Sequence, residues 1–208
     1  MAEGLGTRRG DDLRAFTMLA AMWVRVSWTY RASFLVMTAA SLVITGIDFV
    51  AILVMFGNVD ALGGFGLGEV AFLYGATATC LGLADLVVGN VERLGRQVRL
   101  GQVDAMMVRP VGLLAQVCAH EFALRRLGRI AQGAAVLAWS LTVVRVAWDP
   151  ARVAMLGSLV VCGTAIFVGL FVLGAAFQFV SSDASEVANA FTYGGNAMTQ
   201  YPLTIYPT

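Results

Sequence analysis

The sequence predicts an all-α integral membrane protein, and three features support this class. Of the 208 residues, 59% are hydrophobic and only 13% are charged, whereas charged residues make up about 25% of a typical globular chain. Several apolar stretches are long enough to cross roughly 30 Å of hydrocarbon at about 1.5 Å per helical residue. Most arginines lie outside these stretches. Lipid is therefore the expected solvent for most of the chain.

The N-terminal part, residues 1–32, is predicted to be a cytoplasmic tail followed by an amphipathic helix in the membrane interface. Asp11 and Asp12 are suitable N-cap residues for this helix. Arg14 and Arg25 interrupt its apolar surface, and the Trp and Tyr side chains near its end favour the headgroup region. The alternative is that this helix simply lengthens the first membrane span.

Four membrane spans are predicted within two regions, residues 33–89 and residues 130–180. Small residues recur four positions apart in these spans, which predicts helices that approach closely in a packed bundle. The predicted spans cover about residues 33–56, 70–88, 130–148 and 153–180. The small pairs are Ala78 with Gly82, Ala134 with Ala138, and Ala165 with Gly169.

The arginines predict the orientation of these spans. Five arginines precede the first span, the loop after it has none, and seven lie between the second and third spans. Cytoplasmic loops of membrane proteins carry an excess of basic residues. The N-terminus and residues 90–129 are therefore expected in the cytoplasm.

Few residues are suited to catalysis, and none of the patterns indicates a metal or a nucleic acid partner. The chain has no lysine, which excludes a Walker A loop, because that loop needs a lysine to reach the phosphates. His120 beside Glu121 has no convincing nucleophile nearby, so we interpret it as an interfacial polar residue. The glycines of residues 63–68 lack the dinucleotide-binding spacing and predict a loop. The widely spaced cysteines, expected to be free and buried, are Cys80, Cys118 and Cys162.

Two acidic residues lie within predicted spans. An ionised carboxylate at the depth of Asp48 costs about 2.5 to 3.5 kcal/mol on insertion scales, so something must offset that cost. Asp48 is expected either to make a polar contact in a translocation path or subunit interface, or to be a protonated or hydrated acid on the bundle side. Asp85 lies nearer the cytoplasmic end of the second span, where it is expected to pair with a neighbouring arginine or, alternatively, to belong to the translocation path or a subunit interface.

Residues 90–129 are predicted to form a short amphipathic helix, a second turn and a surface helix. Gly101 is a plausible stop for the first helix, and Pro110 ends the turn that follows because proline lacks a backbone donor. Residues 111–129 mix apolar and charged side chains, which is typical of a helix at a membrane surface. The first helix places Val91, Leu94 and Val98 on one face and Arg93, Arg96 and Arg99 on the others.

Residues 181–208 are predicted to be a cytoplasmic segment that leads to a fifth span. A helix is expected from about residue 183, ending near Gly194 and Gly195, followed by an extended break at Tyr201 and Pro202. The chain is expected either to continue beyond Thr208 into further spans or to have four.

The order of these parts resembles the permease subunits of ABC-2-type bacterial exporters. The cytoplasmic signature R-x-G-x-x-D-x-x-x-x-R-P, which follows the second span in that family, has its counterpart in Arg99, Gly101, Asp104, Arg109 and Pro110. Residues 63–74 and residues 201–207 are also similar to stretches of these permeases. The likeness covers most of the chain.

The resemblance implies a bacterial inner membrane protein with six spans that pairs with a second permease, identical or related. It also implies separate ATPase subunits, which bind ATP and Mg²⁺ and dock on the helix between spans two and three. Leu94 and Val98 are then expected in a groove of the ATPase, with Arg93, Arg96 or Arg99 at its acidic rim. The alternatives are a membrane scaffold that recruits a cytoplasmic partner and an intramembrane enzyme that modifies lipid.

Overall fold

The computed structural model describes residues 31–109, 111–119, 126–144, 146–181 and 185–205, together with a few positions between 14 and 29. The described residues form helices and turns, with a single isolated bridge between Leu62 and Phe65. The predicted all-α class is confirmed. Most of the expected interfacial helix, Pro110, and the pair of His120 and Glu121 lie outside the described residues.

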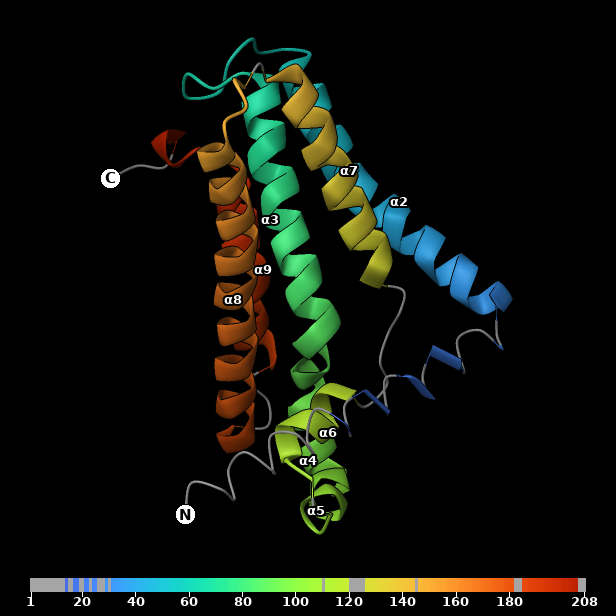
Figure 1. Cartoon of the computed structure of the whole chain (residues 1–208). Coiled ribbons are helices and arrows are strands. Elements are labelled where there is room, and N and C mark those ends of the chain that lie inside the picture. The colour runs from blue at the N-terminus through green and yellow to red at the C-terminus, as the bar shows by residue number, and fades with distance from the viewer. Residues whose placement is uncertain are drawn as a thin grey trace.

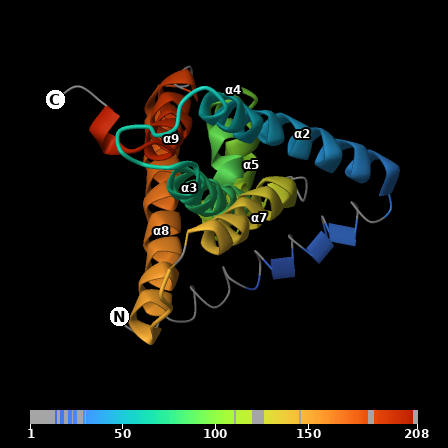
Figure 2. The same ribbon diagram turned by 90° about the horizontal axis from the view of Figure 1, so that it is seen from above.

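The central helix of the bundle is α3 (Leu67–Val88) (Figure 1). On one side of it lie α2 (Arg31–Phe56) and α7 (Leu127–Val143), and on the other lie α8 (Pro150–Val180) and α9 (Ser185–Thr199) (Figure 1 and Figure 2). All four of these helices contact α3. Because α3 is enclosed in this way, most of its side chains are buried, whereas α2 and α8 expose apolar side chains suited to lipid.

Glycines allow α3 and α7 to approach each other closely. A Cβ atom at Gly75 of α3 would lie 2.5 Å from the backbone nitrogen of Leu137, and one at Gly133 of α7 would lie 2.8 Å from that of Thr79. Gly82 meets Ile130 at the same interface. Small residues in membrane helices permit this kind of backbone contact.

Only one of the three predicted small pairs lies in a helix interface. Ala78 and Gly82 are buried, whereas the other two pairs are exposed, because the faces that carry them turn away from α3. Cys162 on α8 is also exposed, which differs from the expected burial, while Cys80 and Cys118 are buried. Spacing alone therefore does not show which face of a span meets another helix.

Three stretches of the described chain are long and apolar enough to cross a membrane: α2, Leu67–Arg99 and Pro150–Phe179. α7 has 17 residues, which is about 25 Å at 1.5 Å per residue. It ends at Val143, short of the predicted residue 148. The chain is extended at Val144 and again at Asp149, which precedes the proline at the start of α8 and therefore disfavours helix.

Residues 185–205 belong to the segment 181–208, for which the sequence predicted a cytoplasmic location, and they pack along the bundle. α9 packs along α8 and α3 instead of lying outside the bundle. Midway along α9, the ring of Tyr193 lies 5.6 Å from the guanidinium carbon of Arg129. One end of the bundle carries most of the described arginines, and we call it the arginine-rich end. The contact between Tyr193 and Arg129 is close to this end.

The far end of this segment reaches the opposite end of the bundle. There η3 (Leu203–Ile205) follows α9, and the Thr204 hydroxyl donates to the carbonyl oxygen of Gly63 at 3.2 Å. Gly63 belongs to residues 57–66, the loop between α2 and α3, so we call this the loop end (Figure 1). The segment thus extends along the bundle from the contact at Arg129 to the loop end.

Candidate functional site

The first candidate site is the tip of the molecule at the arginine-rich end (Figure 1). There η1 (Gly89–Arg93) and α4 (Leu94–Arg99) continue the chain from α3, α5 (Gln102–Met107) reverses its direction, and α6 (Leu113–Ala119) packs against η1. Gly101 permits the reversal because its φ of 67° lies in the left-handed region that favours glycine. The predicted helix, glycine and second turn are confirmed.

The apolar face of α4 packs inwards, against this chain's own core. Leu94 is only 7% exposed and belongs to a cluster with Val91 and Val103, and Val98 packs against the same cluster. The structure therefore does not present Leu94 and Val98 to a groove on a partner, as the sequence had suggested. Periodicity showed that α4 has an apolar face, but it could not show what covers that face.

The outward surface of the tip carries other apolar residues. Leu100, Met107 and Val108 are 59%, 55% and 86% exposed. These three residues follow α4 or end α5, so the pattern of the first helix did not reveal them. The exposed charged residues around them are Arg93, Arg96, Arg99, Asp104 and Arg109.

Buried amide side chains tie the tip to the bundle. Gln178, near the end of α8, accepts a hydrogen bond from the backbone N–H of Gly95 at 3.1 Å. Asn90 of η1 donates to the carbonyl oxygen of Cys118 at 2.9 Å, where burial raises the pKa of the Cys118 thiol to about 11. Because buried amides are costly to leave unpaired, these bonds fix the tip relative to α8 and α6.

A cluster of charges lies where the tip joins the bundle. Arg126 Nε is 3.1 Å from one carboxylate oxygen of Asp85, and Arg129 Nη1 is 3.5 Å from the other. Arg126 also donates to the backbone carbonyl of Asp85 at 2.9 Å. Gly89 leaves room for this cluster, since a Cβ atom there would collide with Asp85 and Arg126. The predicted pairing of Asp85 with an arginine is confirmed.

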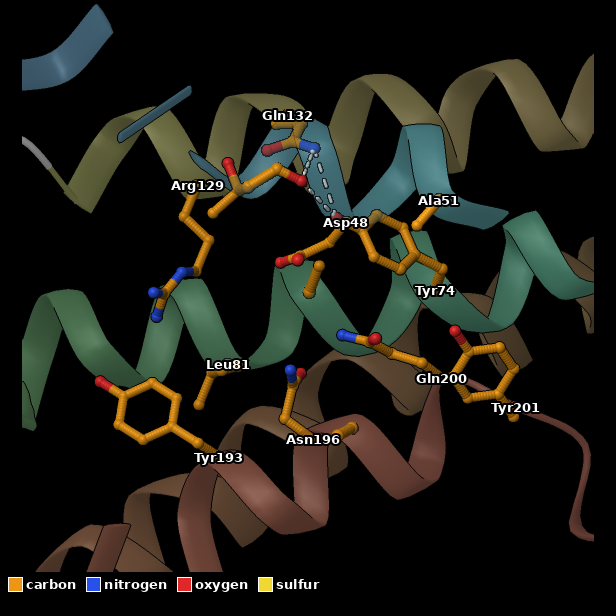
Figure 3. Close-up of a pocket in the computed structure, with 13 residues that line it drawn as sticks. Asp48, Ala51, Tyr74, Leu81, Arg129, Gln132, Tyr193, Asn196, Gln200 and Tyr201 are labelled. Atoms are coloured by element: carbon orange, nitrogen blue, oxygen red, sulfur yellow. Dashed lines mark hydrogen bonds between the residues drawn. The ribbon is translucent and has the colours of Figure 1, made fainter. Parts of the chain in front are cut away.

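The second candidate site is a cavity of about 390 Å³ between α2, α3, α7 and α9 (Figure 3). Arg129 lines both this cavity and a polar cavity of about 200 Å³ around Asp85. The larger cavity is lined by polar and aromatic side chains together with a few apolar ones. Its lining residues include Asp48, Tyr74, Arg129, Gln132, Tyr193, Asn196, Gln200 and Tyr201.

Hydrogen bonds fix the wall of this cavity where α2, α3 and α7 meet. The Tyr74 hydroxyl donates to the backbone carbonyl oxygen of Thr45 at 2.9 Å. Gln132 Nε2 donates to the same carbonyl oxygen at 2.6 Å and to the Tyr74 oxygen at 3.3 Å (Figure 3). Three helices are thus joined through one carbonyl group inside the bundle.

The structure separates the two acids that the sequence singled out. Asp48 lines the larger cavity, whereas Asp85 belongs to the charge cluster next to it. Sequence reasoning missed Tyr74, Gln132 and Asn196. Gln132 could have been noticed as a polar amide inside a predicted span. Asn196 could not, because it lies in a segment for which the sequence predicted a cytoplasmic location.

Comparison with known proteins identifies the family. The family model for ABC-2 family transporter proteins matches residues 42–208, well over half of the chain. The chain belongs to the ABC-2 transporter family. No curated protein and no solved structure matches this ABC-2 protein. The family is one of membrane transport subunits that are not themselves catalytic, and it confirms the resemblance drawn from the sequence.

Proposed function

We propose that this ABC-2 protein is the transmembrane permease subunit of an ATP-driven exporter. It works with separate ATPase subunits that bind ATP and Mg²⁺, and it forms the translocation path with a second permease, identical or related. The observation that carries the proposal is the tip, whose exposed apolar and basic surface continues directly from the central span α3. Exposed apolar groups of this kind mark sites of protein association.

In this proposal the ATPase binds the outward surface of the tip. Leu100, Met107 and Val108 enter an apolar groove, and Arg96 and Arg109 pair with acidic residues at its rim. Arg99 and Asp104, on either side of the reversal at Gly101, remain the proposed coupling residues. Arg93 adds to the basic surface, while Leu94 and Val98 hold α4 to the bundle.

The proposed motion passes from the tip to the spans. When two ATPases close on ATP, α4 is displaced, and α3 moves with it because the chain is helical from Leu67 to Arg99. The hydrogen bond between Gly95 and Gln178 carries α8 along. The tip faces the cytoplasm of a bacterial cell in this arrangement, as the excess of arginine favours.

The first experiment compares the Val108→Asp variant with the Val59→Asp variant. Both residues are exposed, but Val59 lies in the loop at the opposite end of the bundle. A carboxylate at residue 108 is expected to weaken ATPase binding at least tenfold, because it must be buried in an apolar groove, and the substitution at residue 59 should have no effect. The measurement is ATPase co-purification and affinity in nanodiscs.

Charge reversal tests the coupling residues. Arg99→Glu and Asp104→Arg are expected to lower substrate-stimulated ATP turnover, and unchanged binding and turnover in both would contradict their assignment. ATP-dependent movement of substrate into vesicles separates an exporter from a scaffold. One-to-one ATPase binding without such movement would favour the scaffold.

A further inference from the structure

Two amide side chains that line the larger cavity, Gln132 and Asn196, have a buried oxygen that lacks a donor among the described residues. The orientation of the Gln132 amide follows from its partner, because the carbonyl oxygen of Thr45 can only accept and must therefore face Nε2. Its Oε1 atom is buried and has no donor among the described residues, and the same is true of Asn196 Oδ1. Unpaired buried acceptors favour a ligand that supplies N–H or O–H groups.

Asp48 adds a carboxyl group to this set of acceptors. It lies within α2 and lines the cavity, and none of the described arginines forms an ion pair with it. The guanidinium of Arg129, the one basic group in the lining, is engaged by Asp85 at 3.5 Å and lies over the ring of Tyr193. In Figure 3 this guanidinium is directed towards Tyr193, away from Asp48. The carboxyl group of Asp48 is therefore available to a ligand.

Aromatic and small apolar side chains complete the cavity. The rings of Tyr74 and Tyr201 lie at the end of the lining away from Arg129 (Figure 3). Tyrosine rings attract cations through their negative faces. Ala51, Ala78 and Leu81 provide apolar surface for the rest of a ligand. The cavity thus combines a carboxylate, two amide acceptors, aromatic rings and an apolar wall.

We propose that this cavity binds a protonated primary or secondary amine with an apolar body, and that the ammonium group contacts Asp48. The N–H groups of the amine supply the donors that Gln132 and Asn196 lack. This inference rests on the proposed export function, because it identifies the cavity as part of the substrate path. A quaternary ammonium fits less well, since it carries the charge but no donor.

The test measures binding of three small probes by saturation-transfer NMR, with the full chain in nanodiscs. Phenethylamine has charge and donors, its N,N,N-trimethyl derivative has charge only, and phenethyl alcohol has one donor and no charge. Saturable binding of phenethylamine is expected, with each of the other probes at least fivefold weaker. Equal binding of the trimethyl derivative or the alcohol, or no saturable binding of phenethylamine, would overturn the proposal.

Three variants test the site. Asp48→Asn should weaken phenethylamine binding at least tenfold, while Asp60→Asn, the same change at an exposed loop residue, should leave it unchanged. Asp48→Glu retains the carboxyl group and should retain binding. This variant still tests the position if Asp48→Asn does not fold. Binding that is indifferent to all three variants would overturn the assignment. If the unmodified protein captures the ATPase but does not bind phenethylamine, this inference alone is refuted. If it binds phenethylamine but does not capture the ATPase, the proposed function alone is refuted.

Discussion

Asp85 shows how a single charged residue is accommodated inside this bundle. A buried carboxylate loses its hydration, so it is stable only when charges and hydrogen bonds replace the lost water. Arg126 and Arg129 supply these partners at 3.1 and 3.5 Å. Both arginines lie at the start of α7, so the cluster joins the end of α3 to the start of α7. Its role is to hold two helices together beside the cavity.

Removal of the Asp85 carboxylate should therefore destabilise the protein. The Asp85→Ala variant leaves two arginines without their partner, and the expected loss is about 3 to 5 kcal/mol of unfolding free energy. The measurement is unfolding in detergent, followed by tryptophan fluorescence. The Asp60→Ala variant removes an exposed loop carboxylate and serves as control. Equal losses in the two variants would show that the cluster contributes nothing to stability.

Among single residues, the sequence predicted the charged residues of the two sites better than the neutral ones. Asp85 and Asp48 stand out because an ionised side chain within an apolar stretch has a known cost. Gln132 and Asn196 carry no charge, and their importance depends on which helices face each other. Tyr74 is an ordinary aromatic residue in the sequence, and only the fold brings its hydroxyl to the carbonyl group of Thr45.

Among the elements, the pair of α3 and α7 depends most on glycine. Lipid gives helices little hydrophobic reason to associate, so close backbone contact supplies the packing energy. Gly75 and Gly133 allow this contact from opposite sides of the interface. Neither was among the predicted small pairs. Gly75 has the small residue Thr79 four positions on at the same interface, whereas the residues four positions from Gly133 are the larger Arg129 and Leu137.

Gly75→Ala is expected to separate α3 from α7. The added methyl group would lie 2.5 Å from the backbone nitrogen of Leu137, which cannot move as a flexible side chain would. The expected loss is about 1 to 3 kcal/mol of unfolding free energy, typical of overpacking. The matched control is Gly46→Ala in α2, where no atom lies within 4 Å and alanine favours the helix. The midpoint of thermal unfolding, measured in nanodiscs, should fall for Gly75→Ala and not for Gly46→Ala. The same change in both midpoints would refute the packing argument.

Helix ends and partners were harder to predict than the helices themselves. The expected end of α9 at Gly194 and Gly195 is wrong, since the helix continues to Thr199. A glycine within a helix costs only about 1 kcal/mol, which contacts along α3 and α8 can offset. The amphipathic helix α4 was predicted correctly, but not what covers its apolar face. A helix needs the same apolar face whether it packs on the core of its own chain or in a groove on a partner. Sequence periodicity cannot distinguish these two situations.

In the assembled bundle, α9 and the segment that follows it connect the two ends. Tyr193, midway along α9, lies beside the charge cluster at Arg129, and the segment that follows α9 reaches Gly63 in the loop at the other end. The larger cavity lies along this path and is lined by α9 through Asn196 and Gln200. A shift of α9 would therefore change the cavity wall and both ends of the bundle together.

This arrangement predicts the membrane topology of Thr204. With Cys80, Cys118 and Cys162 replaced by alanine, single cysteines are introduced by Thr204→Cys, Asp60→Cys and Ala105→Cys, all at exposed positions. A membrane-impermeant maleimide should label the variants at residues 204 and 60 in intact spheroplasts, because both lie at the loop end. The variant at residue 105, in α5 of the tip, should be labelled only after permeabilisation. If residue 204 instead behaved like residue 105, α9 would not cross the membrane, and a cavity wall formed by α9 would have to be abandoned.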